Sequence, residues 1–138
     1  MGVINEKFHI NTAGHTDIID ITKNVESIVN QHSIKDASVV VYVVGSTAAI
    51  TTIEYEPGLL QDFPAALSKI APPGANYHHD DTWHDGNGHS HILSAIIGNS
   101  ITVPVIDGIL FLGTWQQIVL VDFDNKSRSR NICVQIIT

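Results

Sequence analysis

The sequence predicts one α+β domain over residues 1–138, built on an antiparallel β-sandwich with two or three helices. The 138 residues are close to the usual size of one domain, and a hydrophobic content of 43% is enough to fill a core. The second half of the chain holds four closely spaced strand patterns with tight turns, which is typical of an antiparallel meander. The helical patterns are few and inserted between strands, so no second domain is expected.

The first half of the chain alternates between strand and helix patterns. Residues 4–10 alternate apolar and polar side chains and predict a strand. From Thr22 the apolar residues recur at helical spacing, which predicts an amphipathic helix capped by Asp20 or by Thr22 itself. The valine-rich residues 37–44 predict a strand covered on both faces, and residues 50–54 predict its neighbour.

A helix, a polar loop and four strands are predicted for the rest of the chain. Pro64 interrupts the helical pattern of residues 57–70, so the regular helix is expected to begin near Asp62. Residues 76–91 lack periodicity and predict a long functional loop, with a short helix at residues 91–97. The four strands expected after it are residues 100–105, 109–112, 116–123 and 130–137.

Composition excludes several classes of protein. Cys133 is the single cysteine, so a disulfide scaffold is impossible, which indicates a reducing compartment or a fold that is indifferent to oxidation. A formal net charge of -7 argues against nucleic acid and against an anionic membrane as partners. The N-terminus lacks the pattern of a signal peptide, and the longest apolar run, residues 39–44, is far too short to cross a membrane. We therefore expect a cytoplasmic protein.

Histidine is the unusual residue, because the chain has 8 histidines and only 7 lysines and arginines. Five of them fall within residues 78–91, together with three aspartates. Imidazole and carboxylate groups are the ligands that zinc and similar divalent metals prefer. If the segment is extended, His89 and His91 point the same way, and Gly86 and Gly88 let the chain turn back toward His79. The loop therefore predicts a three-ligand metal site, with a metal-free acid/base site or a solvated polar loop without a functional role as the alternatives.

Three further candidates lie outside this loop. Glu54 ends a predicted strand and could reach the site, or could act as a cap or ion-pair partner. Trp115 and Gln116 open another strand, either as a packed bulge or as ligand contacts. Arg128 and Arg130 alternate near a hairpin tip and could clamp a phosphate, although a solvated edge is the more common explanation.

Six motifs occur in a characteristic order: Gly-Ser-Thr-Ala-Ala-Ile-Thr at 45–51, Glu-Tyr-Glu-Pro-Gly at 54–58, Asn-Tyr-His-His-Asp at 76–80, Asp-Gly-Asn-Gly-His-Ser-His at 85–91, Thr-Val-Pro-Val at 102–105 and Gly-Thr-Trp-Gln at 113–116. Together they resemble the YjbQ family over almost the whole chain. Its members are small proteins described as uncharacterised and also as secondary thiamine-phosphate synthases. The resemblance implies a β-sandwich that assembles as a homotrimer, with a metal-associated pocket near the subunit contacts. It also implies an activity that joins a pyrimidine diphosphate to a thiazole phosphate, as a main or a side reaction.

The resemblance extends to individual site residues, with one departure. His79 and His91 match histidines of the family's pattern, whereas Gly45 stands where many members carry a histidine. His89 or His84 would then have to supply the third ligand.

The residue patterns and the resemblance together give the following expected site. The metal ligands are His79, His89 and His91; the catalytic residues are Asp80, His84 and Asp85; the substrate contacts are Glu54, Asn87, Trp115, Gln116, Arg128 and Arg130. The expected cofactor is a divalent metal, zinc or, with a diphosphate substrate, magnesium, and the expected partner is a small phosphorylated substrate. Two alternatives stay open: a trimeric metal- or ligand-binding protein without turnover, and a metal-dependent hydrolase of unknown substrate.

Overall fold

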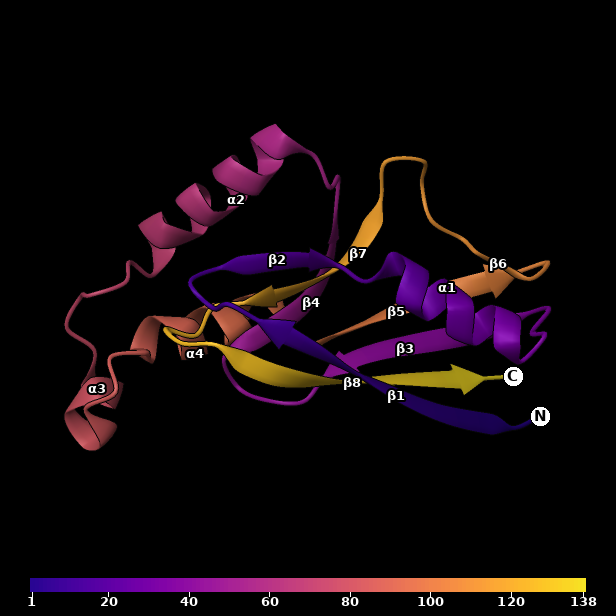
Figure 1. Ribbon diagram of the computed structural model, residues 1–138, viewed down its shortest axis with the longest axis horizontal. Coiled ribbons are helices and arrows are strands. Elements are labelled where there is room, and N and C mark those ends of the chain that lie inside the picture. The colour runs from indigo at the N-terminus through magenta and orange to yellow at the C-terminus, as the bar shows by residue number, and fades with distance from the viewer.

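Two antiparallel sheets and four helices make up the computed structural model, which describes residues 1–138 (Figure 1). The strands are β1 (Val3–Thr12), β2 (Asp17–Asp20), β3 (Ala37–Val43), β4 (Ala48–Ile53), β5 (Ser100–Ile106), β6 (Ile109–Leu110), β7 (Gln117–Asp122) and β8 (Arg128–Ile137). The helices are α1 (Thr22–Gln31), α2 (Pro57–Ile70), α3 (His78–Trp83) and α4 (Gly88–Ile97). The larger sheet has the order β1-β8-β3-β5-β6, and the smaller sheet has the order β2-β7-β4. The predicted α+β class is confirmed, with four helices instead of two or three.

The smaller sheet is the middle of three layers. Its inner face packs against the five-stranded sheet, and α1 packs on the same inner face beside it. Its outer face is covered by α2 and α4. Along β7 the side chains alternate between the two cores, so Leu120 belongs to the first core and Val121 to the second. Burial on both faces explains why β7 is almost continuously apolar.

Two strand predictions were wrong in detail. β3 is buried on one face only, because Val39, Val41 and Val43 are inaccessible while Tyr42 keeps 38% of its surface exposed. The four last strands do not form one meander: β5 pairs with β6, but β7 crosses to the smaller sheet and β8 returns to pair with β1 and β3. β7 has two apolar faces, and both are buried only in the middle layer of the structure. A position in a meander of the larger sheet would leave one of these faces uncovered.

α2 begins earlier than predicted, whereas α1 begins at Thr22 as predicted. α2 starts at Pro57 because the carboxylate of Glu56 accepts hydrogen bonds from the backbone N–H groups of Gly58 and Leu59. The N-cap of α1 is Ile21 and not Asp20 or Thr22, but the carboxylate of Asp20 accepts a hydrogen bond from the backbone N–H of Thr22 at 3.0 Å.

The predicted long loop of residues 76–91 contains α3 and the first turn of α4. Figure 1 shows both helices at the end of the sandwich remote from the chain termini. Short polar helices held by tertiary hydrogen bonds lack the apolar periodicity that identifies a helix in a sequence. None of the four helices is long and apolar enough to cross a membrane.

Candidate functional site

An open pocket of about 380 Å³ lies where β4 begins, β8 begins and α3 approaches α4. Its walls come from five separate stretches of the chain. The lining residues are Gly45, Ser46, Thr47, His79, Trp83, Asp85, Asn87, His91, Arg128 and Arg130. Six of these are among the twelve predicted site residues, so folding brings half of the candidate set to one pocket.

One wall of the pocket is a cluster of imidazoles and carboxylates. His79 Nδ1 lies 3.2 Å from Asp80 Oδ1 and 3.7 Å from Asp85 Oδ1. One ligand atom from each of these three residues lies within 4.8 Å of the others, a separation that suits a shared metal ion. The ring of His91 packs on that of His79, with centroids 4.2 Å apart. The donor set therefore fits a divalent metal.

The electrostatics of His91 favour the neutral ring. Burial lowers the pKa of His91 below its usual value, and the neighbouring His79 lowers it further. A neutral imidazole has a free lone pair on one nitrogen, which is the form that binds metal ions.

Gly88 brings the two helices close enough for this contact. Its backbone N–H donates to Asp80 Oδ1 at 2.9 Å and so fastens the start of α4 to α3. A Cβ at Gly88 would lie 2.7 Å from Tyr77 Cβ, closer than such atoms approach. Glycine is therefore required here by the close approach of the start of α4 to Tyr77.

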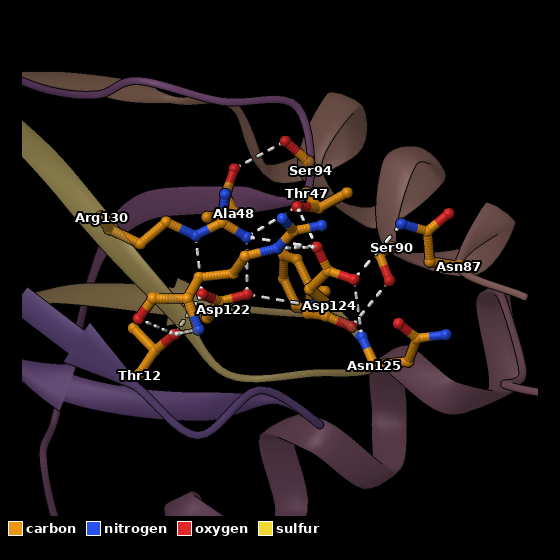
Figure 2. A network of polar contacts seen from close by, with 12 residues as sticks. Thr12, Thr47, Ala48, Asn87, Ser90, Ser94, Asp122, Asp124, Asn125 and Arg130 are labelled. Carbon is orange, nitrogen blue, oxygen red and sulfur yellow. Dashed lines mark hydrogen bonds and ion pairs between the residues drawn. The ribbon is translucent and has the colours of Figure 1, made fainter. Parts of the chain in front are cut away.

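The opposite wall is a network of two arginines and two buried aspartates (Figure 2). Arg130 donates to both carboxylate oxygens of Asp122, at 2.7 Å and 2.8 Å, and to Thr47 Oγ1 at 2.6 Å. Arg128 donates through Nε to Asp124 Oδ2 at 2.8 Å. Asp122 ends β7 and Arg130 lies in β8, so this bidentate pair joins the two sheets at the edge of the pocket.

Asp124 is ionised in this network. Burial alone would raise its pKa, but hydrogen bonds from Asn87 and Arg128 outweigh burial and lower the pKa of Asp124 to about 2. Smaller contributions come from the backbone N–H of Asn125 and from the hydroxyl of Thr47. Arg128 and Arg130 thus both lie beside the ionised carboxylate of Asp124.

Some hydrogen-bonding capacity of this wall is not used within the chain. Arg130 makes its hydrogen bonds through Nε and Nη2, and Arg128 through Nε, so Nη1 of Arg130 and both terminal nitrogens of Arg128 have no partner. Asn87 donates to Asp124 at 3.2 Å, which leaves its own buried Oδ1 without a donor. The wall can therefore donate to an anionic ligand and accept from an N–H or O–H group.

His89 and His84 do not line the pocket. The expectation that His89 and His91 point the same way assumed an extended chain, and it was wrong because both lie in α4, where residues two apart are about 200° apart around the axis. His89 is buried with Nε2 3.3 Å from Ser90 Oγ, and burial lowers its pKa. His84 is an exposed residue in left-handed conformation after α3.

Glu54, Trp115 and Gln116 lie away from this pocket. Gln116 donates to Thr52 Oγ1 at 3.1 Å near the end of β4, while the pocket meets the start of the same strand. The connection between β6 and β7 lies at the opposite end of the sandwich from α3 (Figure 1). The length of β4 thus separates these three predicted substrate contacts from Arg128, and Trp115 is 72% exposed.

Sequence reasoning missed Asp122, Asp124 and Thr47. The sequence did contain a signal for the two aspartates, because they follow an apolar strand pattern and are spaced two residues apart. Arg128 and Arg130, which come shortly after them, have the same spacing. Carboxylates at the end of a strand buried on both faces need partners, and the arginines of the next strand are the nearest cations. Thr47 gave no such signal.

Taken together, the fold and the site define a small α+β protein with an open pocket between an imidazole–carboxylate cluster and an arginine wall. Residues 6–138 match the family model described as "UPF0047 protein YjbQ-like". The chain belongs to this family.

Relatives and solved structures agree with the match. A UPF0047 protein of Archaeoglobus fulgidus is 40% identical over 126 residues, covering 91% of this chain and 95% of that protein. The protein YugU of Bacillus subtilis is 31% identical over 129 residues, covering 92% of this chain and 94% of its own length. A crystal structure of a YbjQ-like protein of unknown function from Sulfolobus solfataricus has a TM-score of 0.92 at 34% identity, covering 99% and 97% of the two chains. A family structure from Clostridium acetobutylicum has a TM-score of 0.87 at 32% identity, covering 96% and 99%.

Proposed function

We propose that this protein is a metal-assisted enzyme that acts on a phosphorylated small molecule. The observation that carries the proposal is that one pocket combines the cluster of His79, Asp80 and Asp85 with the free guanidinium nitrogens of Arg128. Arg128 and Arg130 are paired with Asp124 and Asp122, so the carboxylates of the imidazole cluster have no guanidinium or ammonium partner. A divalent cation would supply that missing positive charge.

His79, His91 and Asp85 would hold the metal, with Asp80 orienting the ring of His79. Two imidazoles and a carboxylate suit zinc, while a diphosphate substrate would allow magnesium. When bound, the ion would neutralise the charge of a phosphoryl or diphosphate leaving group. Asp80 already accepts hydrogen bonds from Gly88 and lies beside His79, which supports an orienting role instead of an acid/base role. Asp85, half exposed, has oxygens available for a ligand or for a proton.

The opposite wall would bind the phosphate. Arg128 and Arg130 offer terminal nitrogens with fixed directions, because their remaining nitrogens are held by buried aspartates. The unpartnered Oδ1 of Asn87 would accept from an N–H or O–H of the substrate. His84 and His89 have no part in this arrangement, since neither lines the pocket.

For the reaction itself we propose the joining of a pyrimidine diphosphate to a thiazole phosphate, in the cytoplasm. The resemblance to the YjbQ family supports it, together with a pocket that offers both metal donors and phosphate donors. Complementation of a thiamine-requiring strain tests it. The wild-type gene should restore growth and a His91→Ala gene should not; equal growth with both would contradict a reaction that depends on His91.

Metal content gives a more direct test of the site. The purified protein should bind about one zinc ion per chain, measured by elemental analysis after dialysis, and His91→Ala should weaken zinc binding by at least tenfold. His78→Ala is the matched control, because His78 is fully exposed and adjacent to His79. Absence of zinc and magnesium from the wild-type protein at saturating concentrations, or equal loss in both variants, would refute the metal site. Stoichiometric metal without any turnover would favour the non-catalytic binding protein.

Assembly as a homotrimer is part of the proposal. Exposed apolar side chains on β6 and on the β6–β7 connection support it, since Ile109, Phe111 and Trp115 are each about 70% exposed. Light scattering on the purified protein should give three times the 15.0 kDa chain mass.

A further inference from the structure

A second hollow of about 290 Å³ adjoins the pocket. The two share Gly45, Ser46 and His91, so together they form one bent groove. The remaining walls of the second hollow carry no charge, and they are Ser94, Ala95, Gly98 and Asn99. One half of the groove is therefore charged, whereas the other half is small and neutral.

Gly45 lies at the junction and controls access to Arg130. A Cβ at position 45 would lie 2.8 Å from Nη1 of Arg130, and φ at this residue is +132°. Arg130 cannot easily move aside, because Asp122 and Thr47 hold its other nitrogens and only 7% of it is exposed. Any side chain at position 45 would cover the one nitrogen of Arg130 that has no partner.

We propose that the groove binds an elongated phosphate monoester, with its phosphate at Arg128 and Arg130 and its uncharged ring over Ala95. Gly45 is then a specificity-determining residue, because its missing side chain leaves Arg130 Nη1 open to the phosphate. The inference rests on the proposed function for the choice of a phosphoryl group, but it names the shape of the substrate and the residues that select it.

Binding of inorganic phosphate and of phenyl phosphate to the metal-free full-length protein, measured by calorimetry, tests the two halves of the groove separately. The wild-type protein should bind phenyl phosphate about tenfold more tightly than inorganic phosphate, because the ring is buried in the neutral hollow. Ala95→Phe should remove that preference and keep the affinity for inorganic phosphate. Ile96→Phe is the control, because Ile96 is exposed on the same helix and does not line the groove.

Gly45→Ala tests the position of the phosphate. It should weaken binding of both compounds about tenfold through loss of a charge-assisted hydrogen bond. Gly74→Ala is the control, since φ at Gly74 is +81° and a Cβ there would meet nothing within 4 Å. It therefore also places a side chain at a positive φ but without the contact, and a thermal melt verifies that both variants fold.

Three results would overturn the inference: no binding of either compound by the wild-type protein, a preference for phenyl phosphate that survives Ala95→Phe, or equal binding by the variants at positions 45 and 74. If Gly45→Ala does not fold, the comparison of Ala95→Phe with the wild-type protein still tests the inference. The outcomes are distinct from those of the proposed function, because metal-free binding requires neither a metal nor turnover. If the protein binds phenyl phosphate as expected but binds no zinc and shows no activity, the proposed binding groove stands and the proposed enzymatic function is refuted.

Discussion

Buried charge is organised at the level of single residues around Arg130. Its guanidinium donates to both carboxylate oxygens of Asp122 and to the hydroxyl oxygen of Thr47. The Thr47 hydroxyl in turn donates to Asp124. Removing one partner from such a pair leaves the other charged and buried, which is costly. Arg128 is the more exposed of the two arginines and has more free nitrogens. The network thus fixes the direction of the groups that face the pocket.

Asp124 should make stability depend on pH in acid. Its folded pKa of about 2 lies below the ordinary value of 3.8, so its stabilising effect is present above about pH 4 and is lost as the pH falls through 2. The loss should be about 2 kcal/mol of unfolding free energy. Urea unfolding between pH 5 and pH 2 measures it, with Asp124→Asn as the reference that lacks this titration. Parallel pH profiles for the two proteins would contradict the assignment.

At the level of elements, α3 and α4 convert a polar segment into one wall of the site. α3 lacks the apolar periodicity that would predict it, and α4 begins three residues before the helix predicted at residues 91–97. Asp80 joins the two helices by accepting a hydrogen bond from the N–H of Gly88. The histidines and aspartates of this segment could be identified from the sequence because their density is unusual. Their directions could not, because a change from extended to helical backbone turns His89 away from His91.

Gly88→Ala tests the packing of these two helices. The added Cβ would overlap Tyr77, so α3 should move away from α4 and separate the ring of His79 from that of His91. Unfolding free energy should fall by about 1–3 kcal/mol, measured in urea, and zinc affinity should fall with it. Gly113→Ala is the control, because a Cβ there meets its neighbours only at ordinary distances of 3.6 Å and more. Equal stability of the two variants would contradict the role assigned to Gly88.

At the scale of the whole molecule, the smaller sheet connects the core to the site. β7 is buried on both faces and continues directly into the buried pair of Asp122 and Asp124. Between them, Phe123 is inaccessible, donates its N–H to Thr47 O at 3.0 Å and accepts from Ser90 Oγ at 2.7 Å. Packing of the middle layer and placement of the pocket therefore depend on the same residues.

Phe123→Ala should test this dependence. Loss of a fully buried aromatic ring should lower the unfolding free energy by about 3–5 kcal/mol in urea titrations. Ile70→Ala, which truncates an isoleucine that is 60% exposed at the end of α2, should change it by less than about 1 kcal/mol. Similar values for both variants would show that the middle layer does not limit stability.

The sequence by itself determined the α+β class, the strand at β1, the amphipathic α1 and the unusual density of histidines in residues 78–91, because each depends on local periodicity or on residue composition. Only the tertiary structure decided that β7 leaves the larger sheet, that Arg128 and Arg130 face the site while Glu54 and Trp115 do not, and that Asp122 and Asp124 hold the arginines in place. These contacts join residues that are far apart in the chain or lie on different strands. Their proximity follows from the packing of the layers, which local sequence patterns do not specify.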